Sequence, residues 1–154
     1  MSHCNSGGYA GKQVLVSYFL GCSDTQPADN TFIQAGWRRG LSFEVNKETI
    51  DVTTAGSTGS FREKIQTFTE ITGSLDGVAI RSTELKALRE YIITTPQADC
   101  WLRFAIPDES GATEIIYIQA MFSSYNLDAN YDGEATNGIN WEAVSVPVFV
   151  DVPA

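Results

Sequence analysis

The sharpest local pattern is the run Asp128-Ala129-Asn130-Tyr131-Asp132-Gly133. It has the first half of a calcium loop, with oxygen ligands at alternate positions and glycine at the sharp turn. The second half does not match a calcium loop, because the twelfth position of such a loop is a bidentate glutamate and here it is Ile139. No helical pattern flanks the run. Asp128, Asn130 and Asp132 are therefore a weak metal candidate, and the run is more simply a glycine-containing turn between strands.

Other catalytic patterns are missing from the sequence. His3 is the single histidine and lies in a polar N-terminal stretch, so a Ser-His-Asp or Cys-His arrangement lacks a positioned base. The run Gly56-Ser57-Thr58-Gly59-Ser60 has neither the Gly-Lys-Ser/Thr ending of a nucleotide loop nor dinucleotide spacing. A pair of neighbouring carboxylates could cleave glycosides, but in a chain with 19 acidic residues such a pair is expected by chance and does not indicate a glycosidase. We expect no enzyme and no cofactor.

Composition excludes several further classes of protein. The net charge of −9 repels phosphates, which argues against an exterior surface for duplex binding. Cys4, Cys22 and Cys100 are an odd number without a close pair, which predicts reduced thiols and no zinc knuckle. Apolar runs such as 115–118 are far shorter than the roughly 20 residues of a membrane span. The N-terminal residues also lack the pattern of a secretory signal.

The elements that would position any site are mostly strands. Isoleucine and valine together number 22 against 8 leucines, a composition that suits a pleated sheet. Apolar residues alternate with polar ones in five segments, and the last valines recur at period two. These strands are expected near 14–19, 41–45, 65–75, 100–106 and 113–122, with a C-terminal edge strand or arm over 144–154. Pro107 and Gly111 predict a hairpin turn between the fourth and fifth strands.

One helix is expected over residues 82–94. Ser82 is a suitable N-cap, Leu85, Leu88 and Ile92 recur at helical spacing, and Pro96 forbids continuation. We therefore predict a single mainly β domain over 1–154, a β-sandwich or partly closed β-barrel with one flanking helix. Residues 1–11 would be a flexible N-terminal arm.

Residues 46–60 are expected to form a long protruding loop. The segment is polar and rich in glycine and serine at its far end, yet it holds Ile50 and Val52 in its near half. A solvated loop gains nothing by exposing apolar side chains, so we predict a protein contact here instead of a floppy hairpin end. The negative charge is concentrated elsewhere: residues 99–154 hold nine acidic residues and Arg103 as their one basic residue. That acidic surface either aids solubility or has a function.

In order along the chain come a polar arm, Gly11 to Val16, a strand ending at Phe43 to Val45, and the segment Thr49-Ile50-Asp51-Val52-Thr53-Thr54 with a glycine/serine tip. Phe61 to Gly73, one helix, a hairpin and a valine-rich end follow. This order resembles the major tail tube proteins of long-tailed bacteriophages. Residues 48–59 carry most of the resemblance, which extends loosely over most of the chain.

The resemblance implies a structural virion protein whose copies form hexameric rings that stack into a hollow tail tube. Tape-measure, tail-terminator and distal tail proteins would be its partners, and genomic DNA would pass through without specific binding. It also implies assembly in the bacterial host cytoplasm. Three sets of residues acquire roles: an inter-ring loop, edge strands that pair within a ring, and acidic residues that line the bore. These sets are Thr49, Ile50, Asp51, Val52, Thr53, Thr54, Ala55, Gly56 and Ser57; Ile65, Thr67, Thr69, Ile71, Val146, Val148 and Val150; and either a substantial share of the acidic residues of 99–154 or Glu44 and Glu70.

Two alternatives stay open. A related tube subunit, such as the inner tube of a contractile injection or secretion apparatus, would share the architecture. A soluble β-sandwich module could instead bind carbohydrate or recognise a host through exposed aromatic side chains. The candidates for the second alternative are Trp37, Trp101, Trp141, Tyr125 and Tyr131.

Overall fold

The computed structural model describes residues 14–53, 64–80, 82–107, 111–129 and 131–153. They form eight strands, one α-helix and one short 3-10 helix, and the prediction of a mainly β chain with one helix is confirmed. The elements are β1 (Leu15–Leu20), η2 (Asp29–Thr31), β2 (Ile33–Gln34), β3 (Arg38–Asp51), β4 (Lys64–Val78), α1 (Thr83–Thr94), β5 (Asp99–Pro107), β6 (Thr113–Asp128), β7 (Thr136–Ala143) and β8 (Val148–Val152).

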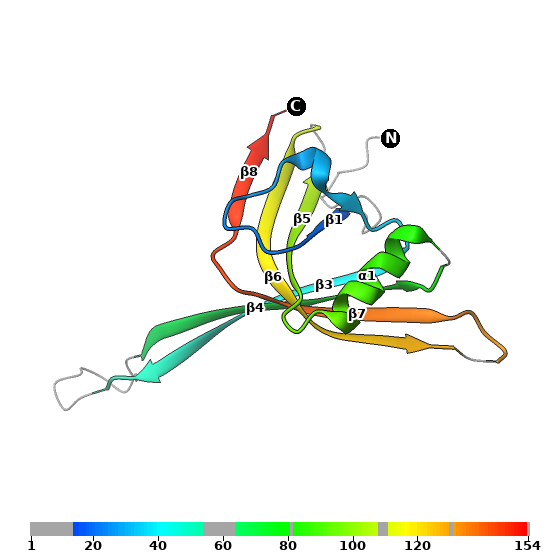
Figure 1. Ribbon diagram of the computed structural model, residues 1–154. Coiled ribbons are helices and arrows are strands. Elements are labelled where there is room, and N and C mark those ends of the chain that lie inside the picture. Colours follow the sequence, from blue (N-terminus) through cyan, green and yellow to red (C-terminus); the bar gives the residue numbers. More distant parts are fainter. Residues whose placement is uncertain (1–13, 54–63, 81, 108–110, 130, 154) are drawn as a thin grey trace, which may run out of the picture.

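All eight strands belong to one antiparallel sheet that does not close into a barrel. Its order is β2-β1-β5-β6-β7-β4-β3, and β8 pairs with β6 beside this path. The 16-residue strand β6 pairs with β5 and β8 in its first part and with β7 in its second, and its register shifts between Phe122 and Ser124. Strand β6 thus connects two parts of the sheet (Figure 1). We call them the β1 layer (β2, β1, β5, β8 and the first part of β6) and the β3 layer (β3, β4, β7 and the second part of β6).

The core lies where these two layers face one another. The Phe104 ring of β5 contacts Phe43 of β3 and Trp141 of β7, with ring centroids 6.2 and 5.8 Å apart. Leu85 and Leu88 of α1 are buried in the same apolar cluster. The sheet therefore folds back on itself to bury one face of each layer, and this packing is sandwich-like although one strand runs through both layers.

Helix α1 begins and ends where the sequence predicts. The Ser82 side chain accepts a hydrogen bond of 3.1 Å from the Leu85 N–H, and Glu84 lies in the first turn, where the helix dipole favours an anion. The helix ends at Thr94, two residues before Pro96. Strands β5 and β6 form the expected hairpin, because Pro107 pairs with Thr113, while residues 108–110 of the predicted turn lie outside the described residues.

The predicted loop over 46–60 is wrong in its first part. Asn46 to Asp51 belong to β3 and pair with β4 out to Asp51 opposite Lys64, so the protrusion here is a two-stranded hairpin. A register shift sets two residues of β4, Thr67 and Phe68, against Glu48. Ile65 therefore does not share a face with Ile71 as the alternation predicted. Two segments lie outside the described residues: 1–13, which include the predicted N-terminal arm, and 54–63, which include the loop positions Thr54, Ala55, Gly56 and Ser57.

Candidate functional site

The β3 layer has one apolar face toward the core and one polar face toward solvent. A full row of the polar face crosses four strands as Ser42, Ser74, Asn140 and Ser124. The Ser42 and Ser74 hydroxyls lie 2.7 Å apart, and the Asn140 amide donates to the Ser124 hydroxyl at 2.6 Å. We call this surface the polar face. Its members are Ser42, Glu44, Asn46, Glu70, Thr72, Ser74, Asp76, Ser124, Asn126, Asp128, Asn140 and Glu142.

Five carboxylates lie on the polar face. Glu44 and Glu70, the acidic residues singled out from the sequence, are both among them. Register brings Glu44 and Glu142 into one row on either side of Thr72, and Glu142 belongs to the acidic residues of 99–154 that were predicted only as a group. Asp76 and Asp128 complete the set. The signal that could have found Glu142 is the alternation of Ile139 and Trp141 with polar neighbours.

A glycine allows the apolar side of this layer to pack closely. A Cβ atom on Gly73 would lie 2.4 Å from the Trp141 ring and 2.5 Å from the Ser42 carbonyl oxygen. Only a residue without a side chain fits there, so Trp141 lies across β4 and is fully buried. The packing fixes the orientation of β4 and β7, and hence of the carboxylates on their other face.

Both borders of the β3 layer are open. Over the described residues, β3 pairs only with β4, and β6 from Ser124 to Asp128 pairs only with β7. Strand β4 pairs with β7 from Thr72 onward, so Ile65, Thr67, Thr69 and Ile71 also lie beside an open edge. Strand β8, with Val148 and Val150, pairs with β6 along one edge, and Val146 precedes it. Open edges present unpaired N–H and C=O groups to another chain.

The far part of the β3–β4 hairpin carries exposed apolar side chains. We call residues 45–53 and 64–71 the arm, which extends to the lower left (Figure 1). Ile50 pairs with Ile65, and these side chains are 51% and 52% exposed, while Phe68 is 71% exposed. A two-stranded ribbon that exposes such residues to water is marginally stable by itself. The arm is therefore suited to contact another chain.

The described residues provide no built metal site and no activated nucleophile. They contain no group of three histidine, cysteine or acidic side chains placed to hold a metal, and Asn130 of the calcium-like run lies outside them. Burial raises the pKa of the Cys100 thiol, and the nearby Asp99 carboxylate raises the pKa of the exposed Cys22 thiol. Both shifts favour the unreactive protonated thiol.

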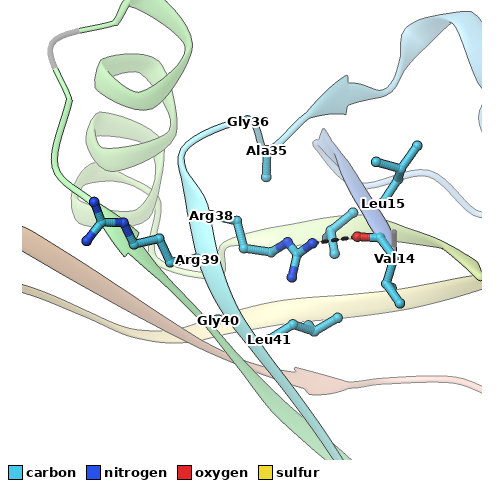
Figure 2. Close-up of a pocket in the computed structure, with 9 residues that line it drawn as sticks. Val14, Leu15, Ala35, Gly36, Arg38, Arg39, Gly40 and Leu41 are labelled. Atoms are coloured by element: carbon cyan, nitrogen blue, oxygen red, sulfur yellow. Dashed lines mark hydrogen bonds between the residues drawn. The ribbon is translucent and has the colours of Figure 1, made fainter. Parts of the chain in front are cut away.

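A hollow beside the start of β3 is no better equipped for catalysis. Figure 2 shows this hollow of about 670 Å³ between the starts of β1 and β3, where Arg38 donates a hydrogen bond of 2.5 Å to the Val14 carbonyl. Arg39 points away from it and pairs with Glu134. Its lining is apolar or glycine apart from the two arginines, so it offers no general base.

No helix in the described part of the chain is long and apolar enough to span a membrane.

The five candidate aromatic residues do not form a sugar-binding platform. Trp37, Trp101 and Trp141 are all buried, and Trp141 and Phe104 pack together in the core. Tyr125 is half-buried, while Tyr131 is fully exposed at the β6–β7 end. The prediction that these tryptophans could stack on carbohydrate is wrong, because burial in the core leaves no ring face free.

A two-faced strand layer with open edges and an exposed arm is thus the main functional feature. The family model for the phage tail tube protein matches residues 9–149. The chain belongs to the phage tail tube protein family. It is therefore a structural protein of the tail tube of a phage-like particle, as the sequence resemblance implied. No match was found among curated protein sequences.

Solved structures share the fold of this tail tube protein. The tail of an empty gene transfer agent particle, determined with C6 symmetry, matches with a TM-score of 0.72 at 20% identity, covering 93% of this chain and 99% of that one. The SPP1 tail tube matches with a TM-score of 0.67 at 10% identity, covering 96% and 80%. The baseplate of the anti-feeding prophage, 6-fold symmetrised, matches with a TM-score of 0.63 at 10% identity, covering 95% and 97%.

Proposed function

We propose that six copies of this chain form a ring with the polar face toward a central bore, and that such rings stack into a conduit for DNA. The observation that carries the proposal is the β3 layer, which is polar on one face, packed on the other and open at both borders. The 6-fold symmetry of two structures with this fold supports the number of copies. Closed cyclic symmetry uses one repeated contact between neighbouring subunits.

Within a ring, the edge of β3 in one copy pairs with the edge of β6 from Ser124 to Asp128 in the next. The two borders belong to the same layer, so this pairing continues the polar face from subunit to subunit. It also satisfies backbone groups that are otherwise left to water. Two other edges are candidates for contacts within the ring. One lies beside Ile65 to Ile71 of β4, and the other runs along β8, with Val146, Val148 and Val150.

The five carboxylates of the polar face give the wall of the bore a negative charge. DNA phosphates are repelled by a surface of the same sign, and repulsion keeps moving DNA from adhering to the wall. Salt screens charges over roughly 8 to 10 Å, so the effect acts on DNA that comes close to the wall. Glu44, Glu70 and Glu142 would lie toward one end of this surface, and Asp76 and Asp128 toward the other.

The arm supplies the contact between rings. Thr49, Ile50 and Asp51 lie at the end of β3, and Val52 and Thr53 continue toward residues 54–63. Burial of Ile50, Ile65 and Phe68 against a neighbouring ring removes their apolar area from water, which stabilises the stack.

The protein acts without catalysis and without a cofactor, in a virion tail that is assembled in the bacterial cytoplasm. Tape-measure, tail-terminator and distal tail proteins would be its partners. The fold shared with the anti-feeding prophage baseplate favours one second candidate, a tube subunit of a contractile injection apparatus.

Size-exclusion chromatography and negative-stain imaging of the purified chain test the proposal. We expect rings with six-fold averages, and tubes at higher concentration. Deletion of residues 55–59 should leave rings and shorten or abolish tubes. A chain that stays monomeric at high concentration would refute ring formation, and unimpaired stacking of the deletion variant would refute a bridging role for residues 55–59.

A further inference from the structure

A hollow of about 740 Å³ lies between the start of α1 and the end of the β6–β7 hairpin. Ile80 and Leu127 line it and are 47% and 49% exposed, and the small Ala135 forms part of its wall. Lys86 and Arg89 of α1 also line it. The hollow thus combines an apolar centre with basic side chains. Neither the tube resemblance nor the polar face assigns it a role.

Its chemistry is complementary to the arm. The arm has exposed apolar side chains in Ile50, Ile65 and Phe68, which match the apolar centre. It also carries three carboxylates and two amines, so its net charge is opposite to that of Lys86 and Arg89. These arm charges are Glu48, Asp51, Glu70, Lys47 and Lys64. Complementary charge favours correct encounter and orientation of the two surfaces.

The two surfaces lie at opposite ends of the β3 layer. In Figure 1 the arm extends to the lower left, while the start of α1 and the β6–β7 hairpin lie to the right. The arm therefore cannot reach the hollow of its own chain. A head-to-tail contact between opposite ends of identical subunits generates an open polymer when its rotation does not close into a ring, and stacked rings are such a polymer.

We propose that the hollow between α1 and the β6–β7 hairpin binds the arm of a second copy of this chain, in the adjacent ring. The inference rests on the proposed ring stacking and names the receptor of the arm. Phe68 and the Ile50–Ile65 pair contact Ile80 and Leu127, and the carboxylates of Glu48 and Asp51 lie near Lys86 and Arg89.

Cysteine cross-linking tests this contact in assembled tubes. The background carries Cys4→Ser and Cys22→Ser and keeps the buried Cys100. Into it we introduce Phe68→Cys in the arm and Leu127→Cys in the hollow, both at exposed positions. A short bis-maleimide should link the double variant into a ladder of multimers along the tube. An equimolar mixture of the two single variants should give dimers only.

Phe68→Cys combined with Phe149→Cys is the control, because Phe149 is 64% exposed against 49% for Leu127 but lies on β8. Tubes that cross-link through the control pair and not through Leu127→Cys would overturn the proposed receptor alone. A background protein without rings or tubes would overturn the proposed function, and the receptor with it.

Charge reversal gives an independent measurement. Lys86→Glu with Arg89→Glu should leave rings intact and raise the protein concentration needed for tubes by at least about tenfold, because like charges then face the arm. Adding Glu48→Lys and Asp51→Lys should restore most of that loss. Normal tube formation by the reversed variant would contradict the contact.

Discussion

Gly73→Ala tests whether close packing between β4 and Trp141 holds the β3 layer in place. The new Cβ would lie 2.4 Å from the Trp141 ring and 2.5 Å from the Ser42 carbonyl oxygen, distances that no real Cβ contact tolerates. The ring can shift only within a filled core, and the carbonyl belongs to the backbone of the β3–β4 pair. Overpacking of this kind costs about 1–3 kcal/mol, and two simultaneous clashes predict the upper end of that range.

Urea unfolding of the unassembled subunit, followed by circular dichroism, measures this loss. About 3 kcal/mol corresponds to a fall in Tm of roughly 6–12 °C for a chain of this length. Gly36→Ala is the matched control, because nothing lies within 4 Å of its Cβ and it lacks a positive φ. The control should be neutral or more stable by about 0.4–1 kcal/mol. Trp141→Phe should recover only part of the Gly73→Ala loss, since the clash with Ser42 persists.

Equal stability of Gly73→Ala and Gly36→Ala would refute the packing argument. It would mean that the β3 layer adjusts without cost, and that its orientation is not fixed by Trp141.

Three further predictions concern the bore, pH and calcium. Glu44→Lys with Glu142→Lys should leave tubes intact but make them retain DNA at low salt, with retention lost steeply as salt rises. Asp24→Lys with Glu114→Lys, two exposed positions outside the polar face, should not have this effect, and equal retention by both double variants would contradict a bore lined by the polar face. Burial, with a smaller contribution from Glu84, raises the pKa of Tyr18 to about 12, so the folded state favours the neutral phenol and the subunit should lose up to about 3 kcal/mol of stability as pH rises from 10 to 12. Tyr18→Phe should flatten this loss in urea unfolding at each pH, and an unchanged slope would assign it to other groups. Millimolar calcium should leave the Tm of the subunit unchanged, and a rise in Tm would show that the calcium-like run beginning at Asp128 binds the ion.

The sequence predicted elements whose signals are local. Ser82 and Pro96 mark the ends of α1 because capping and the missing proline N–H act within one turn. Pro107 and Gly111 marked the β5–β6 turn for the same reason. Such signals do not depend on which strands become neighbours.

The length of the β3–β4 hairpin could not be predicted in this way. Beyond Val45 the strand continues through Asn46, Lys47, Glu48 and Thr49, where no alternation of apolar and polar residues marks a buried face. Pairing with β4 holds these residues extended, and pairing is a long-range property. The polar face was only partly predicted for the same reason, since register alone aligns Glu44 with Glu142.

The positions of the prolines indicate that assembly uses the borders of the β3 layer more than the edge of β8. Natural proteins protect free edges with proline, charge or short strands. Strand β8 is five residues long and lies between Pro147 and Pro153, so its outer edge is poorly suited to extended pairing. Strand β3 is 14 residues long, contains no proline and has no second partner among the described residues. A long edge without proline is a hazard to a monomer, and it is an advantage to a subunit whose neighbour in the ring covers it.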